Sequence, residues 1–232
     1  KIKNMENKKN FNIYSNLMLK LITEKLEPYK EELKQNPELR IEQNTYEFFL
    51  FDGFNEIINV INTLELIEKF IDTEPPKIDG INYSNYLNYH IHNYYQEMYI
   101  LKERLKTYAT KINRRYKKIT DKKLFDSIEE MIIETVDSLS NITGDKGVRN
   151  LHVHNKKFID QELNILGSAS FLVDTNNADF NKLLDSAYIH NKNKWKETIS
   201  KNNETTKTLI DLYFEDLIKV ITKDNIAVIN PN

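Results

Sequence analysis

Cysteine is absent from this sequence of 232 residues. The absence excludes a disulfide framework, thiolate zinc sites and a cysteine nucleophile. Glycine and proline are scarce, with five of each, which leaves little material for the tight turns of an all-β fold. The chain also lacks any run of about 18 apolar residues, so we expect neither a membrane span nor a membrane partner. These absences together favour a helical protein.

Neither sign of charge dominates the chain. Lys and Arg number 33 against 35 Asp and Glu, for a formal net charge of −2. This balance argues against a dedicated double-helix binder, which is usually basic overall, although it leaves room for a local basic patch. Residues 1–10 are polar and lysine-rich, unlike a secretory signal. We therefore expect a cytoplasmic protein.

Apolar residues recur at helical spacing along most of the chain. The pattern predicts helices over residues 10–26, 46–71, 83–119, 121–139, 158–173, 180–199 and 205–221, with a short extended tail at 226–231. Pro28, Pro75 and Pro76 interrupt the pattern because proline cannot continue a helix. The sequence thus predicts an all-α fold, a long-helix bundle of about six to seven helices. We expect one domain over residues 1–232, with a helical extension at about 1–45, a core at about 46–173 and C-terminal helices at about 176–222.

Two of these segments carry defined buried faces. The longest one has a heptad seam, which favours packing along a partner helix at a shallow angle. Its members are Leu87, Ile91, Tyr94, Met98, Leu101, Leu105, Tyr108 and Ile112. In the segment 121–139, with Thr120 or Asp121 as its N-cap, we expect the stripe Leu124, Ile128, Met131, Ile132, Thr135 and Leu139 to be buried.

The functional interpretation depends on the stretch Arg149-Asn150-Leu151-His152-Val153-His154. When the ribose 2′-OH attacks its own phosphate, one group must accept a proton and another must protonate the leaving oxygen. A histidine that titrates near neutral pH can do either. A guanidinium can hold two phosphoryl oxygens as their charge builds, so no metal is required.

The spacing of Arg149 and His154 places a condition on that chemistry. Residues five apart lie about 140° apart around a helix, and on opposite faces of a strand. The pair therefore needs an irregular segment, or two copies of the chain that meet across a two-fold axis. In the simpler alternative, Arg149 caps or pairs with neighbouring helices and His154 is a satisfied interior group.

This stretch resembles the motif of the HEPN superfamily, small α-helical bundles that carry Arg-x(4–6)-His, often with Asn, Asp or His after the arginine. The segment Glu97–Leu105 also resembles one bacterial branch, and the resemblance covers about residues 46–173. One toxin branch has a tyrosine two residues after the histidine, where this chain has Lys156. Regulation through that tyrosine is therefore not expected.

The resemblance implies a metal-independent endoribonuclease without cofactors, often a toxin or defence factor. It implies catalytic roles for Arg149 and His154 and supporting roles for Asn150, His152, Glu97 and Arg104. The partners it implies are RNA, a second copy of the chain that completes the site, and an antitoxin or other protein. Other members of the superfamily have lost catalysis. A non-catalytic module that binds nucleotide, RNA or a protein therefore stays open.

Four further patterns each allow two interpretations. The pairs His90-Ile91-His92 and His152-Val153-His154 allow a metal-dependent hydrolase. However, His90 and His92 lie in a predicted helix, where positions i and i+2 are about 200° apart, so these two cannot chelate one ion together. His90, Glu97 and Arg104, at steps of seven, border a cleft or form ordinary ion pairs.

A group of closely spaced tyrosines either stacks on RNA bases or completes a helix interface; it comprises Tyr83, Tyr86, Tyr89, Tyr94, Tyr95 and Tyr99. The densest basic cluster either guides a phosphate backbone or is a solvated face; it comprises Lys111, Arg114, Arg115, Lys117, Lys118, Lys122 and Lys123.

Overall fold

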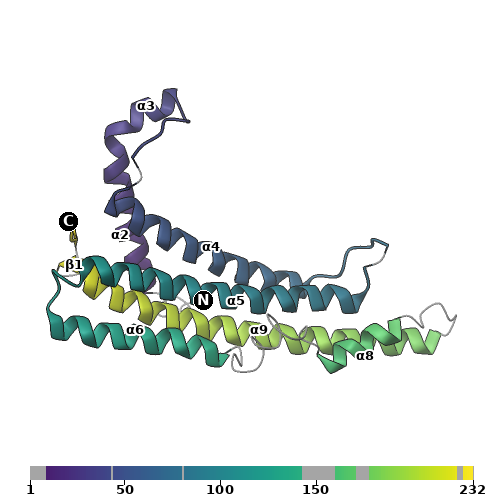
Figure 1. Ribbon diagram of the computed structural model, residues 1–232. Helices are drawn as coiled ribbons and strands as arrows, with labels where there is room; N and C mark the ends of the chain where they lie inside the picture. The colour runs from purple at the N-terminus through teal and green to yellow at the C-terminus, as the bar shows by residue number, and fades with distance from the viewer. Residues whose placement is uncertain are drawn as a thin grey trace. The chain divides into compact units, whose positions relative to one another are not determined.

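The computed structural model describes residues 9–42, 44–79, 81–142, 160–170, 178–223 and 227–231. The helices are α2 (Lys9–Leu26), the 3-10 turn η1 (Glu27–Tyr29), α3 (Lys30–Gln35), α4 (Tyr46–Asp72), α5 (Tyr83–Tyr116), α6 (Lys122–Ile142), α8 (Gln161–Ser170) and α9 (Ala178–Ile221) (Figure 1). Two-residue strands, β1 (Thr222–Lys223) and β2 (Ala227–Val228), pair antiparallel. The prediction of an all-α helical bundle is confirmed. None of the helices within these ranges has the length and apolarity needed to cross a membrane.

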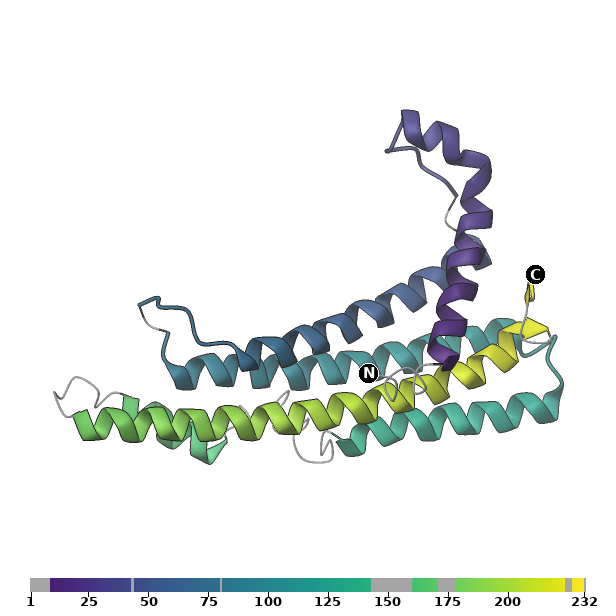
Figure 2. The same cartoon turned by 180° about the vertical axis from the view of Figure 1, so that it is seen from behind.

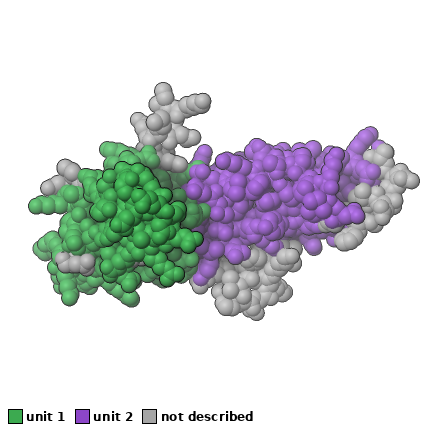
Figure 3. Space-filling view, turned by 90° about the horizontal axis from the view of Figure 1, so that it is seen from above, with its two compact units in different colours: residues 1–59, 101–139, 206–232 green, residues 60–100, 140–205 purple. Residues whose placement is uncertain are grey.

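Contacts divide the chain into two compact units (Figure 3). Unit 1 comprises Lys1–Asn59, Leu101–Leu139 and Thr206–Asn232, and unit 2 comprises Val60–Ile100 and Ser140–Thr205. The helices α4, α5 and α9 each contribute one part to unit 1 and another part to unit 2. The single domain over residues 1–232 stays a prediction.

An aromatic cluster forms the centre of unit 1. The Tyr14 ring of α2 lies 4.6 Å from the Phe214 ring of α9 and 5.5 Å from the Phe54 ring of α4. The Tyr14 hydroxyl lies 2.7 Å from the Tyr108 hydroxyl, which donates to the Leu50 carbonyl oxygen at 2.8 Å. Because the single Tyr108 proton goes to Leu50, Tyr14 donates to Tyr108. The helix α2 is therefore part of the core of unit 1.

The buried face of α6 includes the predicted residues Ile128, Ile132 and Leu139 but is rotated from the predicted one. The predicted residues Leu124 and Met131 are 46% and 37% exposed, whereas Phe125 and Val136 are buried with Ile128, Ile132 and Leu139. The Asp121 carboxylate accepts hydrogen bonds from the amides of Lys123 and Leu124, both at 3.1 Å, and so caps the helix. The buried positions 125, 128, 132, 136 and 139 keep the three- and four-residue steps of a single helical stripe.

The seam of α5 is buried as predicted. All eight of its members are at most 2% exposed. In unit 1, the Tyr213 hydroxyl of α9 donates to the Leu105 carbonyl of α5 at 2.8 Å, and Figures 1 and 2 show these two helices side by side there. The helix ends at Tyr116, three residues before the predicted end at residue 119.

The C-terminal helical segment is one helix, where the sequence predicted two. The predicted break near residues 200–204 is wrong, since α9 runs without interruption from Ala178 to Ile221. This segment contains no proline or glycine, so no residue in it forces a break. Within unit 2, its polar residue Asn203 is buried and donates to the Glu68 carboxylate of α4 at 2.7 Å. A polar residue that looked like a connector is therefore a buried contact between helices.

Gly53 of α4 generates a test of the aromatic cluster. A Cβ atom at this position would lie 2.5 Å from Cε2 of the buried Tyr108 ring. Gly→Ala inside a helix usually stabilises by about 0.5–1 kcal/mol, but overpacking a core costs about 1–3 kcal/mol. Since two hydrogen bonds hold Tyr108, we expect overpacking to win and Gly53→Ala to lower the free energy of unfolding in urea by roughly 1–2 kcal/mol.

The exposed residue Asn55 on the same helix provides the control. Asn55→Ala should change the free energy of unfolding by less than about 0.5 kcal/mol. A Gly53→Ala variant as stable as the parent would contradict the packing described for Tyr108.

Candidate functional site

The predicted motif falls between two helices. The helix α6 ends at Ile142 and α8 begins at Gln161. Residues 143–159 lie outside the part of the chain that the structure describes. The four predicted site residues of this segment, Arg149, Asn150, His152 and His154, therefore lie outside it as well.

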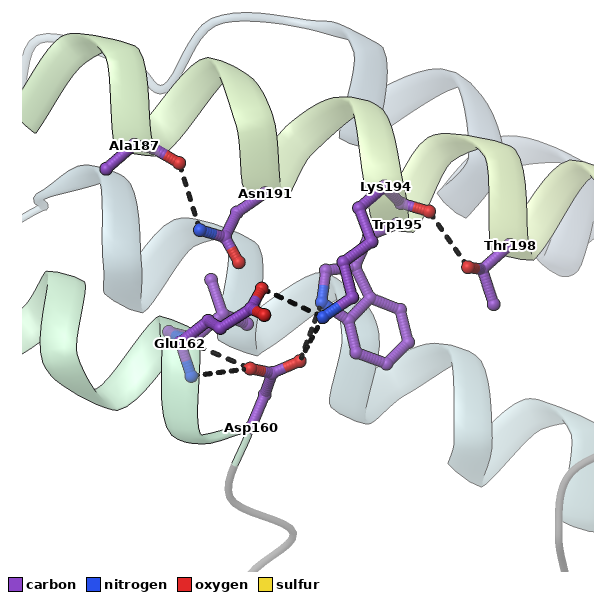
Figure 4. A network of polar contacts seen from close by, with 8 residues as sticks. Asp160, Glu162, Ala187, Asn191, Lys194, Trp195 and Thr198 are labelled. Atoms are coloured by element: carbon purple, nitrogen blue, oxygen red, sulfur yellow. Dashed lines mark hydrogen bonds and ion pairs between the residues drawn. The ribbon is translucent and has the colours of Figure 1, made fainter.

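Asp160, directly after this segment, connects α8 to α9 within unit 2 (Figure 4). One carboxylate oxygen accepts hydrogen bonds from the amides of Glu162 at 2.8 Å and Leu163 at 3.2 Å, so Asp160 caps α8. The other oxygen accepts the indole N–H of Trp195 at 3.1 Å, with Lys194 Nζ at 3.8 Å. The Asp160 side chain is only 10% exposed. The chain that leaves the motif segment is thus attached to α9 at its first described residue.

The sequence did not lead us to predict this network. A local signal was present, because an aspartate just before a helix commonly accepts hydrogen bonds from the first free amides, but the predicted helix begins at Phe158. The bond to Trp195 had no such signal. Asp160 and Trp195 are 35 positions apart in the chain, and only packing brings them together.

The predicted residues of α5 have separate surroundings. His90 is buried and stacks on Phe70 at 5.5 Å, and burial lowers its pKa, so the neutral imidazole is favoured. Glu97 also lies in unit 2, where burial raises the pKa of its carboxyl group. Arg104, in unit 1, forms an ion pair with Glu56 at 3.0 Å, and both side chains are about half exposed. The ion-pair interpretation therefore holds for Arg104, and such an exposed pair contributes about 0–1 kcal/mol to the free energy of unfolding.

Most of the tyrosines on α5 take part in packing. The Tyr83 ring stacks on Tyr188 of α9 at 4.0 Å, and Tyr94 is buried. The Tyr86 hydroxyl donates to the Phe70 carbonyl at 3.0 Å. Tyr89, at 63% exposure, is the tyrosine of this group that offers the most ring surface to solvent. The interface interpretation therefore holds for Tyr83, Tyr86 and Tyr94.

A cavity of about 560 Å³ lies in unit 2, where the α4–α5 connection meets α8 and the start of α9. Its walls are largely apolar and include Pro75, Leu166 and Leu184, but Glu74 and Asp185 also line it. Glu74 is paired with Lys192 at 2.8 Å. Lys77 lines the cavity as well, so the charges of its wall nearly balance and do not select a ligand of one sign. In the described part of the chain, no three His, Asp or Glu side chains come together as a metal site.

The Asp160 network generates the second prediction. Asp160→Ala removes the cap of α8 and leaves the Trp195 N–H without its acceptor. A lost cap costs about 1 kcal/mol, and an unpaired buried donor costs about 1–3 kcal/mol. We expect the free energy of unfolding, followed by circular dichroism in urea, to fall by roughly 2 kcal/mol.

Asp160→Ser separates the two contributions, because serine keeps the cap but cannot reach the indole. Trp195 is the single tryptophan of the chain, so its indole N–H gives one proton NMR signal that reports the bond directly. That signal should move upfield in both Asp160 variants and stay in place in Glu162→Ala, the matched control at an exposed partner of Lys194. An indole signal unchanged by Asp160→Ala would rule out the bond.

Comparison with family models, with curated proteins and with solved structures finds no match to this chain.

Proposed function

We propose that this chain is a metal-independent endoribonuclease of the HEPN type. The observation that carries the proposal is the Arg149–His154 motif, which falls in sequence between α6 and α8 of an all-α bundle. In the proposed mechanism, His154 either accepts the proton of the 2′-OH or protonates the leaving oxygen, water exchanges the other proton, and Arg149 stabilises the charge on the phosphoryl group. The proposed site of action is the cytoplasm.

The surroundings of the motif support this assignment. Catalytic side chains on a connection need rigid elements on both sides. Asp160 supplies such an attachment on the downstream side through its cap and its bond to Trp195. Asn150 and His152 are proposed as supporting residues because they belong to the same segment. Glu97 and Arg104 remain proposed supporting residues through the resemblance alone, since Arg104 is engaged by Glu56.

The proposed active form is a homodimer. Arg149 and His154 diverge on any regular element, so each active site combines the arginine of one copy with the histidine of the other. A two-fold axis then generates two equivalent sites. A toxin or defence role, with an antitoxin or another protein that restrains the activity, is part of the same proposal.

The competing function is a non-catalytic module that binds nucleotide, RNA or a protein. One observation favours a binding role, namely the cavity of about 560 Å³ beside Glu74 and Asp185. Its wall carries Lys77 as well as these carboxylates, so its charge does not distinguish nucleotide from other ligands. Cleavage assays distinguish this function from the proposed one.

The third prediction concerns the catalytic pair. His154→Ala should lower the rate of RNA cleavage by about 10²–10⁴, the usual loss for a general acid or base. Arg149→Ala should lower it by about 10²–10³, because one charge-stabilising group is lost. The parent should cleave RNA in the presence of EDTA and leave 2′,3′-cyclic phosphate ends, while RNA methylated at the 2′ oxygen should resist.

The matched control is His190→Ala, which removes an exposed histidine of α9 and should leave the rate unchanged. If EDTA abolishes cleavage and zinc restores it, the metal-dependent alternative replaces this mechanism. If the parent cleaves no RNA under any of these conditions, the binding module is the better description.

The fourth prediction tests the composite site. Arg149→Ala and His154→Ala subunits are each inactive as homodimers. After random exchange, half of the dimers are mixed, and each mixed dimer holds one intact site of two, so about a quarter of the parental activity should return. Light scattering on the parent should give about twice the chain mass of 27.6 kDa. A mixture as inactive as its components would show that both residues act within one subunit.

A further inference from the structure

Residues 111–126 of unit 1 concentrate positive charge. Seven Lys and Arg side chains against Asp121 and Asp126 give this segment a net charge of +5, while the whole chain carries −2. The rest of the chain is therefore at −7. We name the seven cations the basic surface; they are Lys111, Arg114, Arg115, Lys117, Lys118, Lys122 and Lys123, and all are exposed.

The fold presents these cations together. On the last turns of α5, Tyr108, Ile112 and Tyr116 are buried. Arg114 lies nearly opposite these buried residues around the helix, and Lys111 and Arg115 border the buried stripe on one side. Lys117 and Lys118 follow in the turn after α5, and Lys122 and Lys123 open α6. The basic surface therefore draws its cations from the end of α5, the turn and the start of α6.

Stability does not explain the lysines at the start of α6. A helix N-terminus carries partial positive charge, so acidic residues are favoured there and lysines are disfavoured. The first turn of α6 contains no acidic residue, and Asp121 alone offsets the local charge through its cap. Lysine at two adjacent positions where it is disfavoured, Lys122 and Lys123, points to an anionic ligand that these side chains bind.

The basic surface differs in its partners from the lysines of α9 in unit 2. On α9 within unit 2, Lys192, Lys194 and Lys196 form ion pairs of 2.7–2.8 Å with Glu74, Glu162 and Asp72. By contrast, none of the seven cations forms an ion pair with a carboxylate in the described part of the chain.

Two of the seven rest on aromatic rings. Arg115 lies 4.4 Å above the Phe49 ring and Lys117 lies 5.8 Å above the Phe125 ring. These contacts orient the cations and leave their N–H donors available to an anion.

We propose that the basic surface binds the phosphodiester backbone of single-stranded RNA without regard to base sequence, and that long RNA substrates of the proposed ribonuclease gain affinity through it. Several cations along one path fit a polymer with one negative charge per nucleotide better than a single small anion. The segment exposes Ile119 and Leu124, but its aromatic side chains Tyr116 and Phe125 are buried, so binding to anionic vesicles is the competing outcome of the test. The second half of the proposal rests on the proposed ribonuclease function, and the first half does not.

The test uses the full chain and a fluorescent single-stranded RNA of mixed sequence. Lys118→Glu, Lys122→Glu and Lys123→Glu are combined in one variant. Acidic residues suit the N-terminus of α6, so this variant should remain folded, as circular dichroism can verify. We expect its affinity to fall by about tenfold or more and the slope of log K against log salt to decrease by about 2, since three phosphate contacts are lost.

The matched control reverses three exposed lysines elsewhere, with Lys20→Glu, Lys77→Glu and Lys182→Glu. Both triple variants lower the formal net charge by six, so the control isolates position from total charge. The control should bind RNA within about twofold of the parent at 0.15 M salt, where distant charges are screened. Equal losses in the two variants, or parental binding by the first one, would overturn the proposal. So would a parent that binds phosphatidylserine vesicles but not the RNA.

Cleavage assays separate this proposal from the proposed function. His154→Ala should bind the RNA as tightly as the parent, because binding and chemistry use different residues. The basic-surface variant should cleave a dinucleotide at the parental rate and lose about tenfold in kcat/KM on the long RNA. A parent that binds RNA through this surface without cleaving it would end the ribonuclease proposal and leave the binding surface standing.

Discussion

The buried seam of α5 is the constraint on which both units depend. In unit 2 it supplies Leu87, Ile91, Tyr94 and Met98, and in unit 1 it supplies Leu101, Leu105, Tyr108 and Ile112. Steps of three and four residues keep these side chains on one line only if the neighbouring helices run nearly parallel to it. The neighbours are accordingly long, with 27 residues in α4 and 44 in α9. Few turns are needed to connect such helices, and this matches the scarcity of glycine and proline.

A repeating apolar seam does not define the register of two long helices, because a shift of one heptad restores similar contacts. Buried hydrogen bonds can supply the missing specificity, since they are satisfied in one register only. Unit 1 has the chain from Tyr14 through Tyr108 to the Leu50 carbonyl, together with the bond from Tyr213 to the Leu105 carbonyl. Unit 2 has the bond from Asn203 to Glu68. Shifting the helices would leave these polar groups buried without partners, at a cost of about 1–3 kcal/mol each.

Charge is distributed differently in the two units. In unit 2, lysines of α9 pair with carboxylates of the α4–α5 connection and of α8. In unit 1, the cations of the basic surface face solvent. Surface ion pairs contribute little to stability, so a fold loses little by leaving such cations unpaired. This freedom allows a chain with a net charge of −2 to present a strongly positive surface at one place.

Sequence alone determined the elements whose signals are local. The seam of α5, the start of α4 at Tyr46 and the end of that helix before Pro75 follow from side-chain period and proline chemistry, and the structure agrees with each. The proposal that Arg149 and His154 act in catalysis also comes from the sequence alone. Tertiary structure decided what depends on distant partners. It buried Phe125 and exposed Leu124, joined the two expected C-terminal helices into α9, engaged Arg104 with Glu56, and attached Asp160 to Trp195. The spacing of apolar residues along the chain shows which residues share a helical face. Only packing selects the face that is buried and the partner that a charged group contacts.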